Sequence, residues 1–180
     1  MLNNIKIFEF IEQLVEHIKS KNTFDAILQD VKQTKKTWDQ VARKRVGSVV
    51  KDMFRKLFPE IEIKEALYIE GEGPPVLWKK PYDLFGSGGV YPDIGILRPE
   101  RIAIELDHSE IGRPEIPGSR LKVALAKASF NYLSGDWNYC FVLFHNISGK
   151  PIKPYLNRET EQKILRFYEE RLHTKLYIFE

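Results

Sequence analysis

The chain has 180 residues, of which 43% are hydrophobic and 12% aromatic, so it can bury a sizeable core and is unlike a disordered segment. The net charge of +3 is too small to identify a nucleic-acid-binding protein, and the single cysteine excludes an intramolecular disulfide framework and disfavours a cysteine-based zinc site. No apolar run approaches the roughly 18 residues of a membrane span, and the start of the chain lacks the pattern of a signal peptide, so we expect a soluble, cytoplasmic protein.

Three helices are predicted in the first third of the chain, because hydrophobic residues recur at helical spacing over 5–18, 24–31 and 38–57. Basic residues are concentrated on and before the third helix: Lys32, Lys35, Lys36, Arg43, Lys44, Arg45, Lys51, Arg55 and Lys56. They indicate either a basic patch for a polyanion or the solvated face of a long helix. We expect an N-terminal helical segment at 1–36 and a single globular domain at 37–180.

Strands and helices then alternate. Residues 61–69 change to a period of two, which predicts a strand, and residues 71–89 are rich in Gly and Pro, which predicts a long loop with a short strand near 76–78. Two apolar strands around a turn follow, and then a loop, a helix from 119 to 135, a strand at 138–144, a helix at 158–172 and a final strand. This order predicts an α/β or α+β layered domain, with a mixed sheet flanked by helices and a parallel strand pair joined by the 119–135 helix.

The stretch VYPDIGILRPERIAIELDH, residues 90–108, places acids among residues that should be buried. A simple antiparallel register centred on Pro99 sets Asp93 opposite Glu105, with Asp107 on the same face, and like charges opposed in this way destabilise a strand pair. In one interpretation this face points into water. In the other, which a sheet covered on both faces favours, the carboxylates share a divalent cation such as Mg²⁺ or Mn²⁺.

These residues resemble the motif of the PD-(D/E)xK nuclease superfamily, which includes restriction endonucleases and archaeal Holliday-junction resolvases. The motif here is Pro92-Asp93, eleven residues, then Glu105-Leu106-Asp107, and the order of elements over 37–145 resembles the αβββαβ core of restriction endonuclease-like proteins. The resemblance implies a Mg²⁺-dependent DNA endonuclease with Asp93 and Glu105 as metal ligands. It further implies a possible homodimer for cutting both strands, and Asp52 in the first core helix as an additional ligand.

The departure from the family lies at Asp107, where a lysine is expected. In one explanation Asp107 is a third metal ligand or the base, and Lys122 or Lys127 on the following helix supplies the positive charge. Five residues on a helix lie about 140° apart, so at most one of the two lysines should reach the site. In the other explanation the site has lost its lysine, and the protein is a non-catalytic DNA-binding or assembly protein.

Other residues near the motif have more than one interpretation. His108 is a metal ligand, a base or the first residue of a loop, and Arg113 and Arg120 are candidates for a phosphate contact near the N-terminus of the following helix. Residues 78–80 (WKK) would reach a nucleic-acid groove or belong to an ordinary surface loop. A metal-dependent enzyme for a small phosphorylated substrate is a third possibility, but the basic helix favours a polyanion.

Overall fold

The computed structural model describes residues 2–72, 91–109 and 118–180, and it divides them between two compact units. Unit 1 contains residues 2–72 and 93–101, and unit 2 contains residues 91–92, 102–109 and 118–180. The domain boundary predicted at residue 36 lies inside unit 1.

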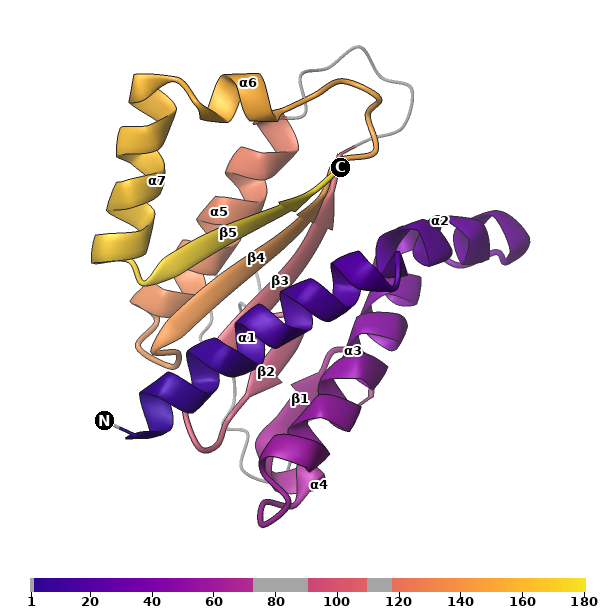
Figure 1. Ribbon diagram of the computed structural model, residues 1–180, viewed down its shortest axis with the longest axis vertical. Coiled ribbons are helices and arrows are strands. Elements are labelled where there is room, and N and C mark those ends of the chain that lie inside the picture. Colours follow the sequence, from indigo (N-terminus) through magenta and orange to yellow (C-terminus); the bar gives the residue numbers. More distant parts are fainter. Residues whose placement is uncertain (1, 73–90, 110–117) are drawn as a thin grey trace. The chain divides into compact units, whose positions relative to one another are not determined.

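Unit 1 begins with three helices, as predicted: α1 (Leu2–Ser20), α2 (Thr23–Gln33) and α3 (Trp38–Leu57) (Figure 1). α1 and α2 pack on α3 through apolar faces, and the ring of Phe24 stacks on Trp38 with 5.8 Å between the centroids. α3 starts with a capping box, in which the Thr37 hydroxyl accepts the Gln40 N–H and the Gln40 side chain accepts the Thr37 N–H. This reciprocal pair fixes where the basic helix begins.

The rest of unit 1 is a short helical turn and an antiparallel strand pair: α4 (Ile63–Ala66), β1 (Leu67–Ile69) and β2 (Ile94–Ile96). The strand predicted over 61–69 is therefore wrong except at its end, since alternation over so few residues does not distinguish a helical turn from a strand. Gly47 lets α3 approach β1 closely, because a Cβ at this position would lie 2.8 Å from Cδ1 of Ile69.

Unit 2 contains β3 (Ile102–His108), α5 (Gly118–Leu133), β4 (Tyr139–His145), α6 (Lys153–Leu156), α7 (Glu159–Arg171) and β5 (Thr174–Phe179). β4 lies between β3 and β5 and pairs with both in parallel, which confirms the predicted parallel pair joined by a helix. α5 packs against all three strands, and α7 packs along β5 (Figure 1). The short helix α6 was not predicted.

The chain is therefore of mixed α/β class, with antiparallel and parallel strand pairs and helices packed against them. The restriction endonuclease-like core stays a prediction. The predicted strand near 76–78 and most of the predicted 71–89 loop lie outside the described residues. No helix in the described part of the chain is long and apolar enough to cross a membrane.

Candidate functional site

Two of the predicted site residues, Glu105 and Asp107, lie on one face of β3, because residues two apart on a strand point the same way. α5 packs against this face, and each carboxylate is bound by a side chain of α5. Both residues are only 4% exposed. For these two acids the structure contradicts the interpretation in which the acidic face points into water.

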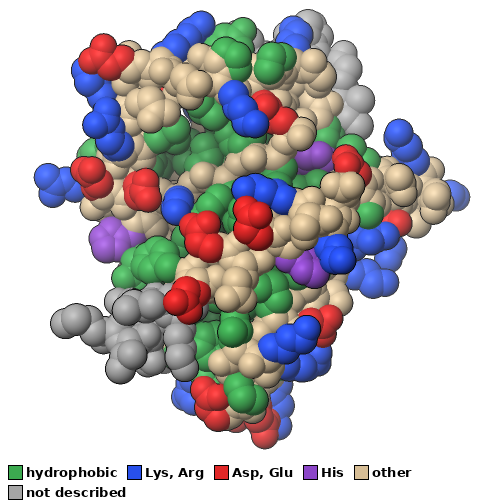
Figure 2. Space-filling model, viewed as in Figure 1, with side chains coloured by type: hydrophobic (Ala, Val, Ile, Leu, Met, Phe, Trp, Pro, Cys, Tyr) green, Lys and Arg blue, Asp and Glu red, His purple; other side chains and the backbone are tan. Residues whose placement is uncertain are grey.

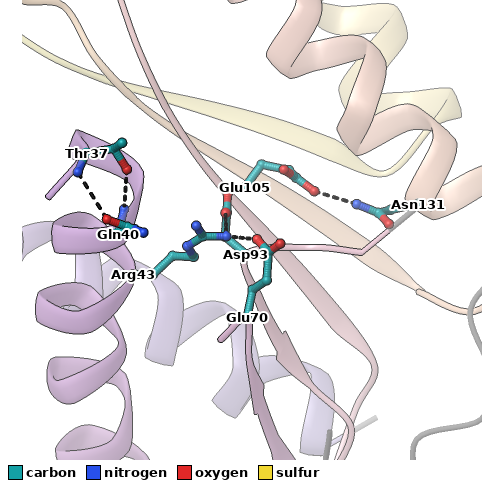
Figure 3. A network of polar contacts seen from close by, with 7 residues as sticks. All are labelled: Thr37, Gln40, Arg43, Glu70, Asp93, Glu105 and Asn131. Carbon is teal, nitrogen blue, oxygen red and sulfur yellow. Dashed lines mark hydrogen bonds and ion pairs between the residues drawn. The ribbon is translucent and has the colours of Figure 1, made fainter. Parts of the chain in front are cut away.

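Glu105 is held by an asparagine of α5. The Nδ2 of Asn131 donates a hydrogen bond of 2.6 Å to Oε1 of Glu105, and Figure 3 shows the amide pointing from the helix toward the carboxylate. Asn131 is fully buried, and its Oδ1 accepts no hydrogen bond within the described residues. Hydrogen bonds to a charged acceptor are stronger than those between neutral groups, so this contact fixes the direction of the Glu105 side chain.

The two carboxylate oxygens of Asp107 differ, because only one of them is bound within the described residues. Oδ1 accepts the His108 N–H at 2.7 Å and lies 3.5 Å from Nη2 of Arg120. The buried Oδ2 has no hydrogen-bond partner in the described part of the chain, nor has the buried Nε of Arg120. Burial raises the pKa of the Asp107 carboxyl, against the opposing effects of the His108 N–H and the charge of Arg120.

The two candidate lysines of α5 lie in different surroundings. The positive charge of Lys127 is among the smaller effects that oppose the burial-driven rise in the pKa of Asp107, whereas Lys122 lines a groove beside Tyr155 and Leu156 on α6. Whether either lysine serves the site stays a prediction.

The remaining neighbours of the motif are less informative. His108 is half-buried at the end of β3, where it pairs with His145, and its Nδ1 lies 2.8 Å from the backbone oxygen of Ser109. Arg113 and the WKK segment at 78–80 lie outside the described residues.

Asp93 belongs to unit 1, where it shares an arginine with a second acid that the sequence did not single out. Nη1 of Arg43, on α3, lies 3.6 Å from Oδ1 of Asp93 and also pairs with the carboxylate of Glu70 (Figure 3). Glu70 directly follows β1, and its N–H donates to the Asp93 carbonyl at 2.9 Å. The two acids are thus cross-strand neighbours held by one guanidinium.

Asp52 is not near Asp93. Its side chain is 64% exposed and pairs with Arg55 one turn further along α3, at 3.0 Å. Asp52 and Arg43 are nine residues apart, about 900° around the helix, so they project from opposite sides of α3. Within unit 1, the acid that neighbours Asp93 is Glu70, and the ligand role of Asp52 stays a prediction.

The donor set of β3 suits a divalent cation. Mg²⁺ is commonly bound by one or two carboxylates, with waters and substrate phosphates as its other ligands, and Glu105 and Asp107 offer such oxygens, one of them unused and buried. No group of three or more His, Cys, Asp or Glu that could hold a metal occurs within 2–72, 91–109 and 118–180. Asp93 lies in the other unit, so its pairing with Glu105 stays a prediction.

Comparison with known proteins assigns no family. Neither a family model, nor a curated protein, nor a solved structure matches the chain. The resemblance to the nuclease superfamily therefore rests on the Pro92-Asp93 and Glu105-Leu106-Asp107 motif and on the order of the elements.

Proposed function

We propose that the protein is a divalent-metal-dependent DNA endonuclease that hydrolyses phosphodiester bonds. The observation that supports this most is the burial of Glu105 and Asp107 on one face of β3, under a helix that contributes polar and basic side chains. Acids are almost never fully buried unless they are paired or bind a metal, and here Asn131 and Arg120 bind one oxygen of each acid, while the buried Oδ2 of Asp107 has no partner among the described residues and is left for a further ligand.

Glu105 and Asp107 supply the carboxylate oxygens that would hold Mg²⁺ or Mn²⁺. When bound, the ion would neutralise charge on the scissile phosphate and lower the pKa of a coordinated water. Asn131 orients Glu105 through the hydrogen bond to Oε1. Asp93 enters the proposal as a further ligand on the basis of the sequence motif alone.

Positive charge near Asp107 supports the explanation in which a basic residue of α5 takes the role of the lysine that the family has at position 107. Lys127 acts electrostatically on Asp107, and Arg120, whose side chain is 40% exposed, lies beside it. A guanidinium with a spare donor can bind a phosphate oxygen while it pairs with a carboxylate. We therefore assign to Lys127 and Arg120 the role of stabilising negative charge on the phosphate.

A second candidate, a non-catalytic DNA-binding protein, is favoured by the pairing of these acids within the protein. Arg43 partly neutralises Asp93, and Arg120 partly neutralises Asp107, without any metal ion. In such a protein these pairs would stabilise each unit, and DNA would be bound and left intact.

Cleavage of labelled single-stranded, duplex, nicked and four-way DNA in Mg²⁺, Mn²⁺ or EDTA tests the proposal. We expect metal-dependent cleavage that Glu105→Gln lowers by at least about 100-fold. Glu170→Gln, an equivalent change at an exposed position of α7, should leave the rate unchanged. Wild-type protein that binds DNA but cuts none of these substrates would establish the second candidate, and cleavage by Glu105→Gln at the wild-type rate would refute the assignment of the site.

The same assay separates the two lysines. Lys127→Ala should lower the cleavage rate by about 10-fold or more, because it removes positive charge close to the phosphate, whereas Lys122→Ala should not. Cutting both strands of a duplex would call for two copies of the site, so analytical ultracentrifugation of the DNA-bound protein should show a homodimer. Equal effects of the two substitutions would contradict the role given to Lys127.

A further inference from the structure

A hollow of about 550 Å³ opens in unit 1 between the end of α1, α2 and α3. Basic side chains line much of it: His17, Lys21, Lys36, Lys44 and Arg45. Asp30 is the one acid among the described residues that line it, and Arg45 Nε binds Asp30 Oδ2 at 2.6 Å. The guanidinium thus offsets the only negative charge, and the hollow keeps an excess of positive charge.

A second hollow of about 460 Å³ adjoins the first and shares Lys36 and Lys44 with it. Its acids are also neutralised, because Glu70 pairs with Arg43 and Glu72 pairs with Lys51. By contrast, Lys21, Lys36 and Lys44 make no ion pair with any acid in the described part of the chain. Figure 2 shows Lys and Arg side chains gathered on the α2 and α3 side of unit 1.

The extent and lining of the two hollows identify the kind of ligand. Two adjoining hollows that share Lys36 and Lys44 carry more positive charge than one small anion would neutralise. Hydroxyls of Thr34 and Ser48 add hydrogen-bond donors to the first hollow. No Phe, Tyr or Trp occurs among the described residues that line either hollow, although proteins that bind single strands stack bases on such rings.

We propose that the adjoining hollows of unit 1 bind the phosphate backbone of duplex DNA through Lys21, Lys36 and Lys44. Lys21, Lys36 and Lys44 are not among the residues to which the proposed function assigns a part in cleavage. The choice of DNA rests on the proposed function, but binding is measured without metal and without cleavage, so the two proposals can fail independently.

The test is fluorescence anisotropy with a labelled duplex of about 20 base pairs in EDTA, over a range of salt concentrations. The variant Lys21→Gln/Lys36→Gln/Lys44→Gln keeps most of each aliphatic stem and removes three charges. If each lysine contacts one phosphate, the slope of log affinity against log salt should become shallower by about 2.7, and Kd should rise by roughly tenfold or more. The matched control Lys64→Gln/Lys150→Gln/Lys163→Gln has the same net charge and should keep Kd within about twofold.

Three results would overturn the inference: no binding by the wild type, equal weakening in the control variant, or a salt slope that does not change in the Lys21/Lys36/Lys44 variant. Displacement of DNA by poly-glutamate at equal charge concentration would also do so, because it would point to an acidic protein. Loss of binding in the Lys21/Lys36/Lys44 variant alone, with no cleavage by the wild type, would uphold this surface while the nuclease proposal fails. Unchanged melting temperatures would show that the variants are folded.

Discussion

Replacing Asn131 by Leu should destabilise the protein by an amount that follows from one contact. The substitution removes the amide that donates to Oε1 of Glu105 at 2.6 Å, while both residues stay in a buried environment. A hydrogen bond to a charged group contributes about 1.5–3 kcal/mol, so we expect the free energy of unfolding to fall by about 2 kcal/mol. For a chain of this length the melting temperature should fall by about 4–8 °C.

A double-mutant cycle isolates the contact. Glu105→Leu should cost a similar amount, because it leaves the buried Asn131 amide without its acceptor, and the double variant should cost at least about 1 kcal/mol less than the sum of the two. Urea denaturation followed by circular dichroism measures all four proteins. Additive costs, within about 0.5 kcal/mol, would refute the reasoning, because residues that do not interact show no coupling.

Three further predictions concern packing, reactivity and pH. In Gly47→Ala the new Cβ meets Ile69 Cδ1, so Ile69→Val, which deletes that atom, should cost about 1 kcal/mol less in the Gly47→Ala background than in the wild type in urea denaturation; equal costs in the two backgrounds would contradict this. Cys140 is fully buried and burial raises the pKa of its thiol, so Ellman's reagent should label it only after unfolding, and rapid labelling of the folded protein would contradict its placement. Partial burial raises the pKa of Glu180, but hydrogen bonds including one from the Ile152 N–H lower it more, so the folded-state pKa lies below its ordinary value. A carboxyl whose pKa is lowered by folding stabilises the protein at pH values above its unfolded-state pKa, and this stabilisation is lost as the pH falls through the folded-state pKa. The free-energy cost of Glu180→Gln, measured by urea denaturation, should therefore shrink between roughly pH 7 and pH 3. A cost that does not change with pH would exclude this role.

The sequence predicted the strands and helices that have long, regular patterns, because their periodicity records burial directly. Alternation in the 102–108 stretch places Glu105 and Asp107 on one face, and the structure confirms this strand. The predicted strand at 61–69 failed because a run of so few residues fits both periods, and a turn of helix there makes its own hydrogen bond from the Leu67 N–H to the Ile63 carbonyl.

The partners of the acids were harder to predict, since a sequence does not show which polar residues meet after folding. A signal for Asn131 was nevertheless present: it continues the buried stripe of Ala124 and Ala128 at helical spacing, where a polar residue is unusual. Glu70 had a weaker signal, since its position beside Asp93 depends on an antiparallel register that the irregular 61–69 segment obscured.

The capping box at the start of α3 connects the uncharged residue Thr37 with its charged neighbour, Lys36. Lys36 directly precedes Thr37, which two hydrogen bonds to Gln40 hold in place, so these bonds between neutral groups fix the point at which Lys36 joins the helix. Loss of an N-cap costs about 1 kcal/mol and loosens the first turn, which would move Lys36 relative to Lys44 two turns later. Replacing Thr37 by another uncharged residue should therefore change how steeply DNA binding depends on salt, while the net charge of the protein stays constant. A comparison of charged positions alone would overlook this effect.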